Sequence, residues 1–360
     1  MAERLRDVFS EDFIVRLIHA IQKEYLRFDA NLFKDLVYQD DWADLALKER
    51  MRRITNSLNE TLPSNYSEAL QVLFPVAPQF KGALAGIIFP DFVQVYGLGH
   101  FNESVQAMEY FTSYSTSEFA VRVFLNQEED RMLEKMLEWT AHPNEHVRRL
   151  ASEGSRPRLP WGLSVPGLKN HPEKTVPILE RLKADESSYV RKSVANHLND
   201  FSHVNPTELL NLASKWYGEN DRTNWIVKHA CRSLLKKGNQ QAMRLFGFEG
   251  SIATEIIGLS IDRETISIGD ELTFQFDLVS NTLDSIRVEY AIDYVKSNGS
   301  RSRKVFMLGS KIDLGKAGHR KMLKKHSFKD LSTRKHYPGS HVLVIIVNGI
   351  EKANVIFELN

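Results

Sequence analysis

The sequence predicts a multidomain α then β protein, with a HEAT-like α-solenoid followed by an Ig-like antiparallel β-sandwich. Three observations predict it. Apolar residues recur at spacings of three and four up to about residue 245, a short basic segment returns at 43 and then 37 residues, and apolar residues alternate beyond residue 250. We expect a helical domain over 1–250 and a sandwich over 253–360, with the boundary near Gly250–Ala253.

The helical part is predicted from amphipathic segments separated by prolines and short polar breaks. FIVRLIHAIQKEYL at 13–26 has apolar residues at helical spacing. The same pattern recurs at 130–142, 174–184 and 206–218. Each segment is long enough for one helix that buries a single face.

A weak repeat runs through this helical part. Val147-Arg148-Arg149 returns as Val190-Arg191-Lys192 and again as Val227-Lys228-His229. Helix pairs with a period near 40 are typical of HEAT-like solenoids. Each copy then places cations at an equivalent position, which predicts a basic stripe. The alternative is that Val-Arg recurs only because helix surfaces accept arginine.

The C-terminal part alternates apolar and polar residues, as half-buried strands do. Examples are 272–278, with Leu272, Phe274, Phe276 and Leu278, and 286–294. Residues 341–359 resemble two strands joined at Asn348-Gly349, a strong hairpin signal. About seven short strands indicate an immunoglobulin type of sandwich, and because the Cys…Trp…Cys signature is missing we expect an Ig-like domain only.

Charge is unevenly distributed along a chain whose net charge is +1. Residues 1–140 hold 14 basic against 22 acidic residues, residues 141–240 hold 16 against 10, and residues 301–335 hold 12 against two. Two basic regions suggest a polyanionic partner, and the alternative is a solvated face. The single cysteine, Cys231, excludes an internal disulfide. With no long apolar run and no secretory signal, we expect a cytoplasmic location and no membrane association.

The most unusual stretch is HVRRLASEGSRPRLPWG at 146–162. One carboxylate, Glu153, lies among Arg148, Arg149, Arg156 and Arg158. We expect a helix from about Asn144 that Gly154 ends as a C-cap glycine. Glu153 then lies in the last turn, where the helix dipole disfavours an anion. The alternative is that Glu153 simply pairs with Arg149, four residues earlier.

The segment from Arg156 to Trp161 holds two prolines, which fix their own φ and bias the residues before them. We expect a stiff extended segment that holds Arg156 and Arg158 as a phosphate clamp. Trp161 offers a π face that binds a cation. The alternative is a core tryptophan under a rigid loop.

A second carboxylate, Glu118, has a structural explanation. Ser115-Thr116-Ser117-Glu118 fits a capping box with Ser115 as N-cap and Glu118 reaching back. This role alone accounts for a glutamate at that position.

Several common catalytic motifs are excluded. His142-Pro143-Asn144-Glu145-His146 matches the H-x-x-E-H zinc pattern, but Pro143 would break the helix that must carry both histidines. Pro143 fits better at the first helical position. The chain has no phosphate-binding glycine motif and no G-x-S-x-G elbow, and Cys231 on a helix is interpreted as a packing residue. We therefore expect no metal site.

At these residues the sequence resembles a known family. TSYSTSEFAVRVFL (112–125) followed by HPNEHVRRLASEGSRPRLPWG (142–162) is similar to the AlkC branch of the HEAT-like DNA alkylation repair glycosylases. YVRKSVANHLNDFS (189–202) matches the next repeat of that family, and some members carry a C-terminal Ig-like domain. The resemblance covers about residues 10–245. It implies a monofunctional DNA glycosylase that removes N3-methylated bases, chiefly 3-methyladenine with 3-methylcytosine as a second candidate, without metal or nucleotide cofactor.

The resemblance places the active site at Glu118, Glu153 and Trp161. A 3-methylated base is cationic and therefore already a good leaving group. The enzyme must stabilise positive charge on the sugar and guide a water to C1′, which a carboxylate does by electrostatics and as a base. We assign this chiefly to Glu153 with Glu118 as its partner, and we expect Trp161 to lie against the sugar or the base.

The expected partner is double-stranded DNA containing alkylated bases, bound mostly through phosphate. We expect a monomer, bacterial and associated with the nucleoid when bound to DNA. Two rival functions remain: a non-catalytic HEAT-repeat scaffold, and a nuclease, which usually needs clustered carboxylates for metal. The predicted phosphate contacts in the helical part are Arg148, Arg149, Arg156, Arg158, Arg191, Lys192 and Lys228. Those in the sandwich are Arg301, Arg303, Lys304, Lys321, Lys324 and Lys325.

Overall fold

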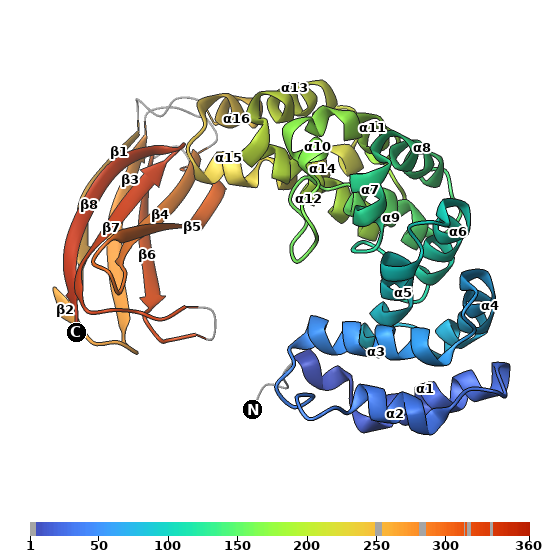
Figure 1. Cartoon of the computed structure of the whole chain (residues 1–360). Helices are drawn as coiled ribbons and strands as arrows, with labels where there is room; N and C mark the ends of the chain where they lie inside the picture. Colours follow the sequence, from blue (N-terminus) through green and yellow to red (C-terminus); the bar gives the residue numbers. More distant parts are fainter. Residues whose placement is uncertain (1–4, 249–253, 281–285, 313, 315–317, 332–333) are drawn as a thin grey trace. The chain divides into compact units, whose positions relative to one another are not determined.

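The computed structural model describes residues 5–248, 254–280, 286–312, 314, 318–331 and 334–360 (Figure 1). By internal contacts the chain divides into two compact units. The first is Met1–Leu209 with Gly218–Ala230, and the second is Leu210–Tyr217 with Cys231–Asn360. The expected boundary at Gly250–Ala253 lies outside the described residues.

Helices make up the first unit. Its N-terminal half contains η1 (Leu5–Val8), α1 (Glu11–Glu24), α2 (Ala30–Val37), α3 (Leu47–Thr61), α4 (Tyr66–Val76), η2 (Ala77–Phe80), η3 (Leu84–Ile87), α5 (Ile88–Tyr96) and α6 (Phe101–Phe111). Its C-terminal half contains α7 (Val121–Gln127), α8 (Glu129–Trp139), α9 (Glu145–Gly154), α10 (Pro166–Asn170), η4 (Pro172–Thr175), α11 (Val176–Leu182), α12 (Ser188–Val204) and α14 (Asp221–Ala230). α13 (Pro206–Trp216) is divided between the two units.

The predicted repeat is present in this half. Its three copies lie in α9, α12 and α14, and Val147, Val190 and Val227 are all buried. α12 packs against both α9 and α14, so the three helices form one continuous layer (Figure 1). Equivalent valines therefore build the same internal face in each repeat.

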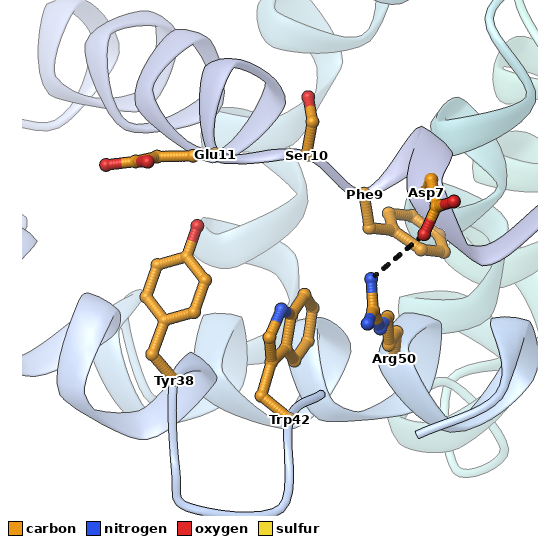
Figure 2. A pocket seen from close by; sticks show the side chains of 7 residues that line it. All are labelled: Asp7, Phe9, Ser10, Glu11, Tyr38, Trp42 and Arg50. Carbon is orange, nitrogen blue, oxygen red and sulfur yellow. Dashed lines mark ion pairs between the residues drawn. The ribbon is translucent and has the colours of Figure 1, made fainter. Parts of the chain in front are cut away.

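A pocket lies among the N-terminal helices, between the start of α1 and the segment that joins α2 to α3. Tyr38 and Trp42 form one side and Ser10 and Glu11 face them (Figure 2). The Arg50 guanidinium is stacked on the Trp42 ring at 4.7 Å. The carboxylates of Asp7 and Glu11 also line this pocket, so its charge does not favour a polyanion.

Strands make up most of the second unit. They are β1 (Thr254–Ile261), β2 (Thr265–Ile266), β3 (Glu271–Ser280), β4 (Ile286–Val295), β5 (Arg301–Ile312), β6 (His319–Ser327), β7 (Gly339–Val347) and β8 (Ile350–Leu359). One sheet has the order β1-β3-β6 and the other β2-β8-β7-β4-β5. All pairs are antiparallel except β2 with β8.

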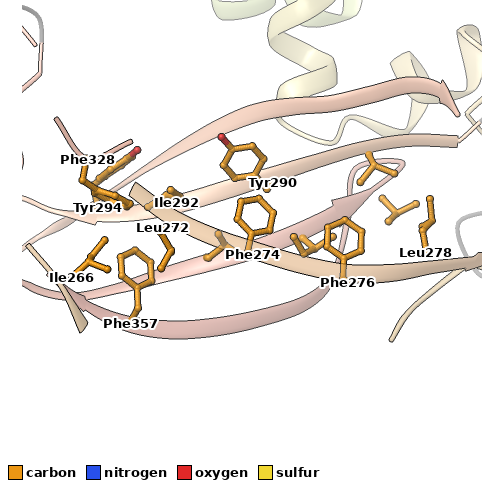
Figure 3. Close-up of a cluster of buried hydrophobic side chains, with 14 of the residues drawn as sticks. Ile266, Leu272, Phe274, Phe276, Leu278, Tyr290, Ile292, Tyr294, Phe328 and Phe357 are labelled. Atoms are coloured by element: carbon orange, nitrogen blue, oxygen red, sulfur yellow. The ribbon is translucent and has the colours of Figure 1, made fainter. Parts of the chain in front are cut away.

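The core of the sandwich consists of the alternating residues that the sequence predicted. Leu272, Phe274, Phe276 and Leu278 of β3 are buried together with the apolar residues of β4 (Figure 3). The predicted hairpin joins β7 and β8. Its turn residues Asn348 and Gly349 have φ of 46° and 78°, as a two-residue turn matching the strand twist requires.

Two short helices, α15 (Arg232–Lys236) and α16 (Gln240–Leu245), belong to this second unit. Gly238, between them, approaches the β7–β8 turn so closely that a Cβ would lie 2.5 Å from the carbonyl oxygen of Gly349. The sandwich therefore has helical segments packed on it, and a cut at residue 253 would remove them from their support.

Cys231 is buried, and burial raises the pKa of its thiol to about 12. It is a packing residue, as expected. In the part of the chain that the structure covers, no helix is both long and apolar enough to cross a membrane.

Candidate functional site

The helix that carries Glu153 starts where the sequence predicted. Asn144 is its N-cap, and its side chain accepts a hydrogen bond from the His146 backbone N–H at 2.9 Å. Pro143 therefore lies before the N-cap and not at the first helical position, as we had expected. His142 lies outside the helix and His146 packs on the Tyr189 ring, so the two histidines do not share one helix face.

Gly154 does not act as a C-cap. It is the last residue of α9 and is absent from the positive-φ glycines. The glycine is required by packing, because a Cβ there would lie 2.5 Å from Val121 Cγ2 and 3.0 Å from Met136 Cε. Gly154 thus allows α7 and α8 to lie close to the last turn of α9.

Glu153 is buried and both of its carboxylate oxygens are held. Arg156 Nη1 donates to Oε1 at 2.6 Å, and Ser193 Oγ donates to Oε2 at 2.7 Å. Arg149 Nη2 lies 3.8 Å from Oε1, so the expected pairing four residues back exists but is the weaker contact. Only about 8% of the Glu153 side chain is exposed. These donors, and not solvent, therefore set the orientation of the carboxylate.

A third carboxylate, Asp200 of α12, holds Arg156 in turn. Arg156 Nε and Nη2 donate to its two oxygens at 2.9 and 3.0 Å. Burial lowers the pKa of Arg156, but the hydrogen bonds and charges of Asp200 and Glu153 raise it above its ordinary value. Every nitrogen of this guanidinium therefore has a protein partner, and the role of Arg156 as a phosphate clamp stays a prediction.

Glu118 lies beside Glu153, and Arg149 bridges them. Arg149 Nη1 is 2.6 Å from Glu118 Oε2. Thr116 Oγ donates to the same oxygen at 2.9 Å. The expected capping box is not formed, because the helix that follows begins at Val121 and Glu118 lies in the turn before it.

The neighbouring Arg148 is also bound within the protein. Its Nε and Nη2 donate to Asp185 at 2.7 and 3.1 Å, and its Nη1 donates to the carbonyls of His142 and Pro143. Arg148 and Arg149 are thus both bound to carboxylates of the protein, and their contact with DNA phosphates stays a prediction. Their charges are satisfied by carboxylates from adjacent segments, which hold successive repeats together.

The other predicted contacts of the helical part differ in exposure. Arg158, Lys192 and Lys228 are exposed. Arg191 is half-buried and donates to the backbone carbonyls of Asp185 and Glu186. Their contact with DNA stays a prediction.

The segment from Arg156 to Trp161 is not extended, as we had expected, but forms two turns. Prolines restrict φ and leave ψ free, so they fit turns equally well. The second turn is closed by the Gly162 N–H, which donates to the Leu159 carbonyl at 3.2 Å. Trp161, with φ of 63°, holds the position that usually requires glycine.

Trp161 is 64% exposed and is not a core residue. It lines an open pocket of about 460 Å³ together with Phe119 and residues of α3, chiefly Lys48, Arg52 and Arg53. Phe119, which lines this pocket, follows Glu118 directly in the chain. Arg52 is bound to the buried Asp91 by two hydrogen bonds at 2.9 and 3.0 Å.

The basic residues of the sandwich lie on the two edge strands β5 and β6. The rings of Phe306 and His326, 4.9 Å apart, join these strands, so the cations share one edge of the unit. Asp293 and Glu351 bind the guanidinium of Arg303, and its contact with DNA stays a prediction. Arg301 donates to the Ser340 carbonyl at 3.1 Å. Of the contacts predicted on this edge, Lys304, Lys321, Lys324 and Lys325 are exposed lysines.

Ser193, Asp200 and Lys48 were not identified from the sequence. Neither was Tyr189, whose ring lies 5.0 Å from the Arg149 guanidinium. One signal was available. Ser193 replaces Leu150 at the equivalent position of the next repeat, and a polar residue on an internal face needs a buried partner. Nothing in the sequence pattern marks Lys48, which lies 113 residues from the loop it contacts.

Two family profiles match the chain. The family profile described as DNA alkylation repair enzyme matches residues 105–234, which include Glu118, Glu153 and Trp161. A second profile, the C-terminal Ig-like domain of the uncharacterised protein YhaZ, matches residues 255–360. Over 355 residues the chain is 50% identical to the uncharacterised protein YhaZ of Bacillus subtilis (strain 168), covering 99% of both chains.

Among solved structures, the chain is similar to the alkylpurine DNA glycosylase AlkC of Pseudomonas fluorescens, which was solved bound to DNA containing an abasic site analog. The TM-score is 0.95 at 38% identity, and the match covers 99% of this chain and 100% of that one. Such a likeness over both units fixes the fold as a helical-repeat region followed by an Ig-like domain. The chain therefore belongs to the AlkC family of DNA alkylation repair glycosylases.

Proposed function

We propose that the chain is a monofunctional glycosylase that hydrolyses the N-glycosidic bond of cationic N3-alkylated bases in duplex DNA. The proposed substrates are 3-methyladenine first and 3-methylcytosine second. One observation carries the proposal. Two nearly buried carboxylates from different segments, Glu118 and Glu153, converge on the single guanidinium of Arg149. Burying two carboxylates side by side costs desolvation free energy. The same carboxylates can stabilise positive charge that develops in a transition state.

In the proposed chemistry, Glu153 stabilises the positive charge that develops on the sugar. Its oxygens are fixed by Arg156 and Ser193, so no reorganisation is needed when charge builds on the sugar. Each carboxylate oxygen has a second lone pair, so Glu153 can still accept a proton from an attacking water. Glu118 is its partner, and Trp161 lies against the sugar or the cationic base.

Selectivity follows from the same groups. Glu118 and Glu153 share Arg149, and Asp200 pairs with Arg156, so three carboxylates lie close together. A cationic base gains attraction from the nearby carboxylates, whereas a neutral base does not. We assign DNA contact first to Arg158, Arg191, Lys192, Lys228 and the sandwich edge, because Arg148, Arg149 and Arg156 are already bound to carboxylates.

The proposal includes a partner and a place in the cell. We propose double-stranded DNA with alkylated bases as the partner, a monomeric protein, a domain division in which the Ig-like part assists DNA binding, and a bacterial cytoplasmic location near the nucleoid. The chemistry assigned to Glu153 uses neither metal nor nucleotide cofactor.

The test is release of free base from N-methylated duplex DNA with EDTA present. Wild type is compared with Glu153→Gln, and Glu145→Gln serves as the control because Glu145 is exposed on the same helix. We expect wild type and the control to release 3-methyladenine and Glu153→Gln to lose at least about 100-fold in rate at similar DNA affinity. Binding without release by wild type would support a scaffold function instead.

A further inference from the structure

The placement of Trp161 depends on its backbone and not on packing of its ring. The side chain is 64% exposed, so neighbouring side chains do little to orient the indole. Its φ of 63° is a conformation that a tryptophan adopts only when surrounding contacts impose it. The contacts that impose this turn therefore decide where the indole points.

One such contact comes from α7. Arg122 is 1% exposed, and its Nη1 donates to the carbonyls of Gly154 and Arg156, both at 2.9 Å. Its Nε donates to the carbonyl of Leu163. A single guanidinium thus ties the first and last residues of the loop to one point.

Arg122 is unusual because it is a buried arginine without a carboxylate in ion-pair contact among the described residues. Burial lowers its pKa to about 10. Gly162 is matched to it, because a Cβ at Gly162 would lie 2.9 Å from Arg122 Cδ. A buried guanidinium whose hydrogen bonds go to backbone carbonyl oxygens acts as a clamp on the backbone.

The second contact comes from α3, far away in the sequence. Lys48 Nζ donates to the carbonyl of Trp161 itself. The same ammonium lies 4.5 Å from the centre of the Phe119 ring. Lys48 therefore connects the turn to the residue that follows Glu118, across the pocket that all three line.

We propose that Arg122 and Lys48 are positioning residues that fix the Trp161 turn and thereby the indole at the damaged nucleotide. The part concerning the nucleotide rests on the proposed function, whereas the part concerning the turn does not. Neither residue touches the substrate. Arg122 closes the loop and Lys48 holds the carbonyl of its tip.

The first measurement is ¹⁹F NMR of the full chain labelled with 5-fluorotryptophan. The chain has five tryptophans, and Trp161→Phe assigns the resonance of Trp161. We expect Lys48→Met and Arg122→Lys to shift or broaden that resonance and to leave the other four in place. Lys48→Arg should restore it, because a guanidinium can reach the same carbonyl. Lys23→Met, at an exposed lysine of α1, is the control.

The second measurement is single-turnover base release beside equilibrium DNA binding. We expect Lys48→Met to lower the rate by about 10- to 100-fold and to change affinity less than about threefold, since misplacement of a positioned group acts on the chemical step. An unmoved Trp161 resonance, or a moved resonance with an unchanged rate, would overturn the proposal. If wild type releases no base, the proposed function fails, and the NMR result still judges the turn.

Discussion

Arg156 donates a hydrogen bond to Glu153 across 2.6 Å, and the two residues are only three positions apart. Local spacing alone does not fix this contact, because a free arginine at that position would turn to solvent. Asp200, from the next repeat, binds the other two nitrogens of the guanidinium. The orientation of Glu153 is therefore set by the packing of α12 on α9.

The first prediction concerns Asp200. Asp200→Asn removes the charge that holds a buried guanidinium, and we expect it to lower the free energy of unfolding by about 3–5 kcal/mol. Urea denaturation gives the value. The control is Glu138→Gln, in an exposed pair with Lys135, which should cost less than about 1 kcal/mol. Equal effects of the two substitutions would contradict the role of Asp200 in holding Arg156.

The second prediction is a pH dependence of stability that originates at His197. This side chain is completely buried, with Nδ1 2.8 Å from the Ser152 carbonyl and Nε2 3.0 Å from Thr175 Oγ. Burial lowers its pKa from 6.5 to about 3. Below pH 6.5 the unfolded chain therefore takes up a proton that the folded chain refuses.

Stability from this group is fully present above pH 6.5 and is lost as the pH falls toward 3. The loss reaches about 5 kcal/mol, from roughly 3.5 pKa units at 1.36 kcal/mol each. His197→Gln should flatten the stability profile between pH 7 and 4, measured by urea denaturation at each pH. If the free energy of unfolding of the variant falls with pH as steeply as that of wild type, other groups cause the loss of stability.

The third prediction concerns Gly154. In an ordinary helix, glycine to alanine stabilises by up to about 1 kcal/mol. At Gly154 the new Cβ would meet Val121 at 2.5 Å, so we expect Gly154→Ala to destabilise by about 1–3 kcal/mol instead. Thermal unfolding beside the exposed Glu145→Ala checks the sign. A higher melting temperature for Gly154→Ala would show that α7 yields to the new methyl group.

The fourth prediction concerns the sandwich edge. Replacing Lys321, Lys324 and Lys325 by alanine should weaken DNA binding and reduce the slope of log K against log salt by up to about 3, since each phosphate contact contributes about 0.9. Arg303→Ala should change the slope less, because Asp293 and Glu351 already bind it. Anisotropy titrations over a salt series measure both. Substitution is preferable to deletion at residue 253, which would divide the second unit.

Much of the fold was predictable because burial leaves a periodic trace. The repeat of Val147 and Val190 and the alternation in β3 both mark internal faces, and Asn348-Gly349 marks a turn by its backbone freedom. These signals are local. The two carboxylates, Glu118 and Glu153, came from the family resemblance instead, and the fold brings their segments together.

The partners of the arginines were not predictable. Arg148 finds Asp185 at a separation of 37 residues, and Arg156 finds Asp200 at 44. A charged residue has the same appearance in sequence whether it faces a carboxylate or a phosphate. Only the stacking of one repeat on the next decides between the two, and that stacking places Asp185 and Asp200 against the arginines.

The clamp by Arg122 has a consequence for how such a site changes over evolution. It binds the carbonyl oxygens of Gly154, Arg156 and Leu163, which every amino acid supplies. An exposed side chain between them, such as that of Arg158, is therefore free to vary without loss of the loop conformation. Single substitutions at the loop surface can therefore change the lesion preference, while the loop backbone that Arg122 holds stays unchanged.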